Sequence, residues 1–231
     1  MYEGLPECSY IISDNPRLLM AKVISRFFVE KRGPTIAKTA VISNEVKIGK
    51  NVTIGEYCVI EGKVIIGDNT YIGHHVCISG DTIIGRNCHF KSGSVIGEEG
   101  FGFERDENDI NVHFPQIGRI EIGDNVSIGA NSTIERAALE VTKIENGVAI
   151  DDLTQVGHNV TIGRGTTVAN GAVLCGGVIV GERCSIAPNA CIRQRLKIGH
   201  DSLIGLGAVV VKDVPPNSVY VGNPAKQMGK K

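Results

Sequence analysis

The stretch TQVGHNVTIG, residues 154–163, contains the pattern that decides the fold. Val156 and Ile162 stand six residues apart, and Thr154 and Val160 each precede one of them by two positions. The same beat extends in both directions, from Ile36 to Val210, with small or β-branched residues in the second register. Helices place apolar residues three and four apart, and plain strands alternate without a six-residue beat. The pattern therefore indicates neither an amphipathic helix nor a plain alternating strand.

A hexad with two inward-pointing residues is typical of one face of a β-helix, in which stacked coils share a continuous core. Each hexad supplies a short strand and a turn, and three hexads complete a triangular coil of 18 residues. About 26 hexads predict between eight and nine coils, spaced by about 4.8 Å. Three cysteines occupy the small inward position and are interpreted as core residues: Cys58, Cys88 and Cys184.

We therefore predict an all-β chain with three parts. Residues 1–33 form a strand and a helix, which Asp14 or Asn15 caps and which packs on the solenoid or on a neighbouring chain. Residues 34–212 form the β-helix, with loops near 97–121 and 135–142. Residues 213–231 form a tail that leaves the pattern through two consecutive prolines. Insertions in a solenoid become loops on one face, often the binding face.

Composition excludes several classes of partner. Lys plus Arg is 24 and Asp plus Glu is 25, so the net charge of -1 gives no electrostatic reason to expect nucleic acid or an anionic membrane. No apolar run approaches the ~20 residues that span a bilayer, and no apolar signal core begins the chain, so a cytoplasmic protein is expected. The seven cysteines lack a C-x-x-C pair, and no His-x4-His occurs, so no metal site is predicted.

Four stretches carry a resemblance to a known family: DNPRLLMAKVISRFF, GFGF, PQIGRIEIGDNVSIGANSTIERAAL and IDDLTQVGHNVTIG. They resemble the bacterial UDP-3-O-acylglucosamine N-acyltransferases of lipid A synthesis, within the left-handed β-helix acyltransferases. The resemblance implies the left hand and a homotrimer with sites between chains. It also implies acyl transfer to the amine of a nucleotide-linked amino sugar, with no cofactor besides a thioester co-substrate.

Three departures from that family shape the expected function. The family's N-terminal domain is present only as its last strand and helix, a second family histidine is matched by Arg195, and the GNPAK tail resembles sugar acetyltransferases that use acetyl-CoA. The principal expectation is therefore N-acyl transfer from acetyl-CoA. The alternatives are the lipid A enzyme itself, which takes 3-hydroxyacyl chains from acyl carrier protein, and a non-enzymatic solenoid scaffold.

The resemblance makes His158 the general base. An amine that attacks a thioester must lose a proton, and an imidazole can accept one at neutral pH. Asp152 stands where the family usually has Asn; an ionised Asp beside the ring would orient it and favour its charged form. That contact is not settled by position, since the ring's partner could come from another subunit. Asp151 and Gln155 in the same motif are assigned to the acceptor.

The 18-residue period predicts the neighbours of His158 on the next coils. Gly176 should stack beside it, with a backbone N–H open to a developing oxyanion, unless it simply makes a turn with Gly177. Gln194 and Lys212 continue the same line toward a pantetheine arm. Further candidates are Arg195 and Lys226 for the donor's phosphates, and Phe101, Phe103 and Arg136 for the acceptor. For the polar residues the alternative is a solvated side chain, and for the two phenylalanines an anchor to a neighbouring subunit.

Overall fold

The computed structural model describes residues 11–29 and 33–230. It divides into two compact units, residues 1–33 and 34–231, which are described separately. The first contains helix α1 (Pro16–Phe27), where Pro16 takes the first turn and the Asn15 side chain accepts a hydrogen bond of 3.0 Å from the Leu18 N–H. Of the strand expected before it, residues 9 and 10 lie outside the described residues, and Ile11 and Ile12 form no strand. The predicted packing of this helix stays a prediction.

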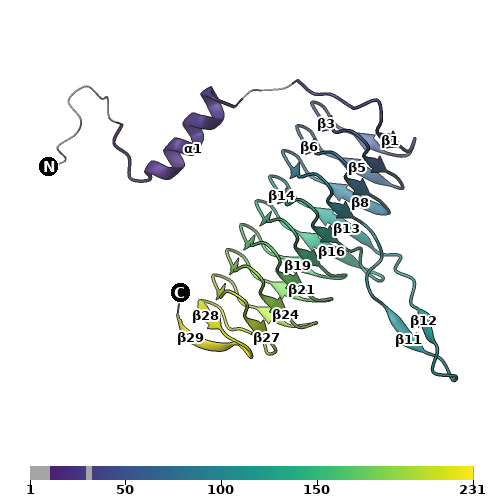
Figure 1. Cartoon of the computed structure of the whole chain (residues 1–231), viewed down its shortest axis with the longest axis vertical. Helices are drawn as coiled ribbons and strands as arrows, with labels where there is room; N and C mark the ends of the chain where they lie inside the picture. The colour runs from purple at the N-terminus through teal and green to yellow at the C-terminus, as the bar shows by residue number, and fades with distance from the viewer. Residues whose placement is uncertain (1–10, 30–32, 231) are drawn as a thin grey trace. The chain divides into compact units, whose positions relative to one another are not determined.

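The second unit is a solenoid whose chain passes in turn through three parallel sheets (Figure 1). The nine-strand sheet contains β1 (Val41–Ile42), β4 (Val59–Ile60), β7 (Cys77–Ile78), β10 (Val95–Ile96), β15 (Thr133–Ile134), β18 (Gln155–Val156), β21 (Val173–Leu174), β24 (Cys191–Ile192) and β27 (Val209–Val210). The eight-strand sheet contains β2 (Lys47–Ile48), β5 (Val64–Ile66), β8 (Asp81–Ile84), β13 (Arg119–Ile122), β16 (Val141–Ile144), β19 (Thr161–Ile162), β22 (Ile179–Val180) and β25 (Lys197–Ile198).

The ten-strand sheet contains β3 (Thr53–Ile54), β6 (Tyr71–Ile72), β9 (His89–Phe90), β14 (Ser127–Ile128), β17 (Ala149–Ile150), β20 (Thr167–Val168), β23 (Ser185–Ile186), β26 (Leu203–Ile204), β28 (Ser218–Val221) and β29 (Lys226–Lys230). Its last two strands belong to the tail. Beyond the prolines, β28 pairs in parallel with β26, and β29 returns antiparallel to β28. The ladder of parallel strands therefore continues past residue 212. The two prolines lie in a turn, and the residues on either side of them, Val214 and Val219, pair with the preceding coil.

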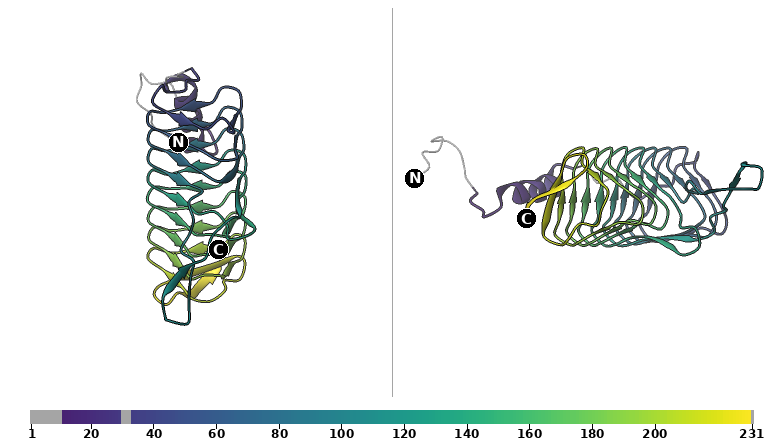
Figure 2. Two further views of the ribbon diagram at one scale, coloured as in Figure 1. Left: turned by 90° about the vertical axis from the view of Figure 1, so that its right-hand side faces the viewer. Right: turned by 90° about the horizontal axis from the view of Figure 1, so that it is seen from below.

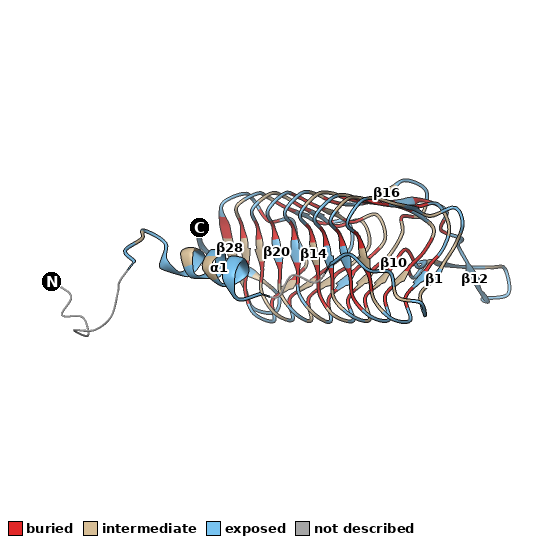
Figure 3. Ribbon diagram, turned by 90° about the horizontal axis from the view of Figure 1, so that it is seen from above, coloured by how far each residue is buried: buried red, intermediate tan, exposed pale blue. Residues whose placement is uncertain are grey.

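The core is made of the two inward registers that the hexads predict. Val156 and Ile162 are fully buried, and so are the smaller residues Val160 and Cys58. Buried residues recur along the three solenoid sheets, while the hairpin of β11 (Phe103–Arg105) and β12 (Asn111–His113) is exposed (Figure 3). Burial raises the pKa of the Cys58 thiol, so this side chain stays protonated and behaves as a small core residue. Figure 2 shows the stack of coils from two further directions.

Both interruptions leave the solenoid at one edge, where the chain passes from the nine-strand to the eight-strand sheet. The larger runs from β10 to β13 and carries the hairpin of β11 (Phe103–Arg105) and β12 (Asn111–His113), which projects from the coils in Figure 1. The smaller separates β15 from β16. We call this edge, made of residues 97–118, 135–140, 157–160, 175–178 and 193–196, the insertion edge.

Candidate functional site

His158 lies on the insertion edge, in the turn between β18 and β19, one coil after the smaller insertion. Its side chain is half-buried, and the imidazole ring contacts the next residue of the turn, Asn159. The Nδ1 atom of His158 lies 3.0 Å from the Asn159 Oδ1 atom. That same oxygen accepts a hydrogen bond of 3.0 Å from the Ala138 N–H, in the smaller insertion.

This arrangement assigns the tautomer of the imidazole. Because the backbone N–H of Ala138 can only donate, the Asn159 atom facing it must be the oxygen, and an oxygen facing Nδ1 requires Nδ1 to carry the proton. In the neutral ring the lone pair then lies on Nε2. Asn159 itself has a φ of 59°, a left-handed conformation that Asn adopts more readily than most residues. The turn geometry therefore leaves Nε2 as the basic atom.

Gly176 lies directly against that atom, as the 18-residue period predicts. A Cβ built on Gly176 would stand 2.5 Å from His158 Nε2, so only a glycine leaves room for the ring. The strands beneath confirm the stacking, since Gln155 pairs with Val173. Gly157 is confined in the same way, because a Cβ there would stand 2.8 Å from the Gly176 nitrogen.

The backbone N–H of Gly176 is one of several at this turn position that have no hydrogen-bond acceptor among the described residues, together with those of Asn170, Glu182 and Gln194. The N–H groups of Ala130, His158 and Arg164 each donate to a carboxylate of a neighbouring coil, at 2.7, 3.0 and 3.1 Å. Among the residues that the structure describes, the Gly176 N–H has no such acceptor. A donor without a protein partner beside a basic nitrogen is suited to bind an oxyanion.

Glu135, at the start of the smaller insertion, was not identified from the sequence. Its Oε2 atom accepts a hydrogen bond of 3.0 Å from the His158 N–H, and its Oε1 atom accepts one of 2.7 Å from Gln155 Nε2. Gly100, from the larger insertion, packs against it so closely that a Cβ would stand 2.3 Å from Oε2. Glu135 thus connects both insertions to the histidine turn.

These residues surround a pocket of about 510 Å³. Gln194 and Arg195 close it on the side of the later coils, and Phe101, 84% exposed, lines it from the larger insertion. Of the other predicted site residues, Lys212 follows the same column one coil beyond Gln194, and Lys226 begins β29. Neither lysine lines this pocket.

Two other acceptor candidates, Phe103 and Arg136, support the insertions. The Phe103 ring packs on Phe101 with centroids 5.0 Å apart and on His113 at 5.2 Å. Arg136 Nε donates a hydrogen bond of 2.6 Å to the Gly97 carbonyl, which ties the smaller insertion to the larger one. Within the chain, both residues position the loops.

The contact between Asp152 and His158, which the sequence left open, is not made within a single chain. Asp152 lies on a different edge, where the chain passes from the ten-strand to the nine-strand sheet, and it accepts hydrogen bonds from Lys91 Nζ at 2.8 Å and the Ala130 N–H at 2.7 Å. Asp151 lies beside it, 3.8 Å from Lys91 Nζ. The hydrogen bond from Lys91 lowers the pKa of the Asp152 carboxyl. Successive turns occupy different edges of a triangular coil, and Asn159 orients the ring instead.

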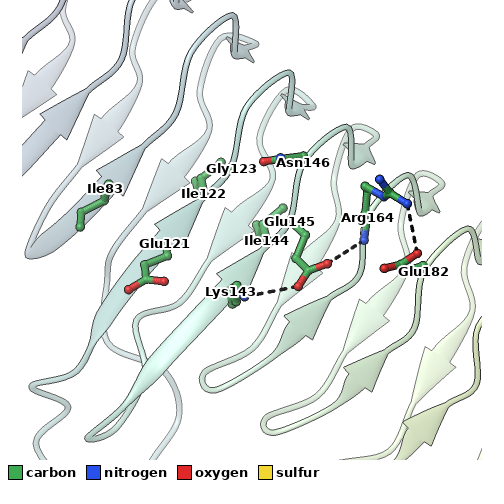
Figure 4. A pocket seen from close by; sticks show the side chains of 10 residues that line it. All are labelled: Ile83, Glu121, Ile122, Gly123, Lys143, Ile144, Glu145, Asn146, Arg164 and Glu182. Carbon is green, nitrogen blue, oxygen red and sulfur yellow. Dashed lines mark hydrogen bonds and ion pairs between the residues drawn. The ribbon is translucent and has the colours of Figure 1, made fainter.

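A second hollow, of about 630 Å³, lies along the outer face of the eight-strand sheet (Figure 4). Its charged side chains are engaged with one another: Lys143 Nζ lies 3.3 Å from Glu145, and Arg164 lies 3.6 Å from Glu182. No histidine is among the residues that line it. The pocket on the insertion edge is therefore the candidate active site.

Comparison with protein families matches several segments of the chain. Residues 142–176 match the bacterial transferase hexapeptide (six repeats), residues 119–152 the hexapeptide repeat of succinyl-transferase, and residues 23–101 the GMPPB C-terminal domain. Two of these matches cover the strands on either side of the candidate site.

Curated relatives and solved structures also point to hexapeptide-repeat transferases. UDP-3-O-acylglucosamine N-acyltransferases from Delftia acidovorans and Janthinobacterium sp. are each 37% identical over 131 residues, 57% of this chain, and the chain spans only 39% and 37% of their lengths. The structure of LpxA from Acinetobacter baumannii is similar with a TM-score of 0.76 at 30% identity, covering 84% of this chain and 74% of that one. The Francisella novicida UDP-N-acetylglucosamine acyltransferase has a TM-score of 0.78 at 28% identity, with coverage of 85% and 71%.

The fold and the site together define a hexapeptide-repeat β-solenoid with a histidine pocket at one edge. The chain belongs to the left-handed β-helix acyltransferases, and its sequence is close to the UDP-3-O-acylglucosamine N-acyltransferases within them. In the part of the chain that the structure covers, no helix has the length and apolar character needed to cross a membrane.

Proposed function

We propose that this chain transfers an acyl group from a thioester to the amine of a nucleotide-linked amino sugar, with His158 as general base. One observation carries the proposal: the Asn159 contact leaves Nε2 of His158 as the basic atom, beside the unpartnered N–H of Gly176. The names of the curated relatives support an amino-sugar acceptor.

The geometry supports a direct transfer. The acceptor nitrogen attacks the thioester carbonyl carbon while His158 Nε2 removes a proton from it. The negative charge that develops on the carbonyl oxygen is stabilised by the Gly176 N–H. When the carbon–sulfur bond breaks, the imidazolium gives its proton to the thiolate, so that the products are an amide and a thiol. No cofactor besides the thioester co-substrate is required.

For the donor we propose a short acyl-CoA, most simply acetyl-CoA. Arg195 lines the pocket where the related lipid A enzymes are expected to have a second histidine. A guanidinium binds phosphates through charge-assisted hydrogen bonds and is a poor wall for a hydrocarbon chain. Lys212 and Lys226, farther along the later coils, are proposed to contact the donor outside the pocket.

A second candidate is supported by the names of the relatives: the lipid A acyltransferase that takes 3-hydroxyacyl chains from acyl carrier protein. Competition between acetyl-CoA and 3-hydroxyacyl carrier protein decides between the two. A clear preference for the carrier protein would assign the chain to lipid A synthesis and reject the acetyl-CoA proposal.

We also propose that the protein assembles as a homotrimer with sites between chains. The outer face of the nine-strand sheet, which ends at the insertion edge, carries a row of partly exposed apolar residues that includes Val59, Cys77 and Val95. Thr133 and Gln155 interrupt this row, and the apolar residues on either side of them are suited to pack against another chain. Light scattering should give three times the chain mass, and an active monomer would contradict the shared site.

The experiment that tests the activity uses the purified chain, CoA thioesters and UDP-linked amino sugars. Release of free thiol that depends on both substrates, and that is lost in His158→Ala, is the expected result. Absence of turnover with every donor and acceptor pair would favour the scaffold alternative.

A further inference from the structure

The Glu135 carboxylate makes a further hydrogen bond besides the one that it accepts from the His158 turn. Both of its oxygens are fixed, Oε2 by the His158 N–H at 3.0 Å and Oε1 by Gln155 Nε2 at 2.7 Å. It is half-buried between β15 and the larger insertion, and the absence of a side chain at Gly100 makes room for it. A carboxylate held so firmly still has acceptor capacity, since each oxygen can accept more than one hydrogen bond.

Besides the amide oxygens of Gln155 and Gln194, the pocket therefore presents an anionic acceptor, the Glu135 carboxylate, and a basic one, the Nε2 atom of His158. Its cationic side chain, Arg195, lies on the later coils. A nitrogen acceptor with two or three N–H groups can satisfy the carboxylate and the imidazole together. A hydroxyl has one hydrogen, so binding it would leave one of the two acceptors facing a lone pair.

We infer that Glu135 binds the acceptor's nitrogen and makes the site selective for amines over hydroxyls. This inference rests on the proposed function and adds a specificity-determining residue to it. The carboxylate attracts the acceptor in its ammonium form, and Arg195 draws the anionic donor to the opposite side of the pocket.

The protons balance as follows. The ammonium has three, of which one passes to solvent before attack and one passes through His158 Nε2 to the departing thiolate. The third stays on the amide nitrogen, where Glu135 can retain its hydrogen bond. The bond that forms is carbon–nitrogen, the bond that breaks is carbon–sulfur, and neither step requires an oxidant or a reductant.

The test compares two matched acceptor probes, UDP-glucosamine and UDP-glucose, which differ by an amine and a hydroxyl. The dissociation constant of each is measured by calorimetry without a donor, and kcat/KM is measured with acetyl-CoA. In the wild-type chain UDP-glucosamine should bind at least ~10-fold more tightly. Glu135→Gln should reduce that ratio by about 10-fold or more, since a hydrogen bond to a charged group is lost. Glu135→Asp, which keeps the charge, should retain most of the preference.

Glu145→Gln is the matched control. Glu145 also accepts a backbone N–H from the next coil, that of Arg164 at 3.1 Å, but it lies at another edge of the solenoid. It should leave the amine preference unchanged. An equal loss of affinity for both probes in Glu135→Gln, or a wild-type chain that binds both equally, overturns the inference. Because binding is read without a donor, a chain that prefers the amine yet transfers nothing would instead reject the proposed function alone.

Discussion

Replacing Gly176 by Ala should strongly reduce the proposed acyl-transfer activity while leaving the chain folded. A Cβ at this position would stand 2.5, 2.8 and 2.9 Å from the Nε2, Cε1 and Cδ2 atoms of His158. Ordinary van der Waals contact begins near 3.4 Å, so the ring must move by about 1 Å or rotate toward solvent. Gly176 does not have a left-handed φ, and alanine therefore adds no backbone strain.

The expected magnitude follows from that displacement. A shift of about 1 Å in a reacting group costs ~10²-fold in rate, equivalent to about 2.7 kcal/mol of activation free energy. The ring also loses its bond to Asn159 Oδ1, which removes the preference for a basic Nε2. Stability should change little, because Gly→Ala gains about 0.4–1 kcal/mol through the unfolded state and one lost hydrogen bond costs about 1 kcal/mol.

Initial rates of thiol release and the thermal unfolding midpoint measure both effects on the same samples. Gly229→Ala is the control, because a Cβ there meets no heavy atom within 4 Å and the residue lies in the edge strand β29. It should match the wild type in rate and midpoint. Turnover in Gly176→Ala within about twofold of the wild type would refute the placement of the His158 ring or its part in the reaction.

Three further substitutions test the site and its surroundings. His158→Ala should lower kcat by about 10²–10⁴-fold, the loss typical of a general base, with an unchanged circular dichroism spectrum. Asn159→Asp keeps the oxygen at the ring and adds a negative charge that favours the imidazolium, so the acidic limb of the pH–rate profile should move to higher pH; an unmoved limb would contradict the contact. Lys91→Met should destabilise the fold at neutral pH, because the pKa of the Asp152 carboxyl is lowered by its hydrogen bond from Lys91. That contribution is present above the carboxyl's ordinary pKa near ~3.9 and disappears as pH falls through the lowered value, so the two unfolding curves should converge in acid.

The solenoid could be predicted from the sequence because each coil contacts only its neighbours, so that a short repeat defines the core. Two inward positions per hexad supply most of the buried residues, and a step of 18 residues gives the parallel pairs of the uninterrupted coils, as Gln155 and Val173 illustrate. The same arithmetic placed Gly176 beside His158. It could not anticipate that β28 resumes the ladder after two prolines, since pairing there depends on the path of the turn.

The parts of the site that the sequence did not reveal lie across an insertion. Regular coils pair residues 18 apart, but the turns around the smaller insertion interact over 22 or 23 residues, as Glu135 and His158 do. Counting by 18 from His158 leads to Glu140 rather than Glu135. The role of Asn159 was hidden for another reason: Asn recurs at left-handed turn positions along the whole solenoid, and only the contact with Nδ1 distinguishes this one.

The candidate site exists because the repeat is broken there twice. The larger insertion brings Phe101 over this edge, and the smaller one brings Glu135 under the His158 turn and Ala138 against Asn159. The coils that follow are regular, so Gly176 meets the ring at the ordinary stacking distance with its N–H unoccupied. The proposed base, the proposed oxyanion donor and a carboxylate thus lie together where an irregular part of the solenoid meets a regular part. Shortening either insertion should therefore abolish the proposed activity without unfolding the coils.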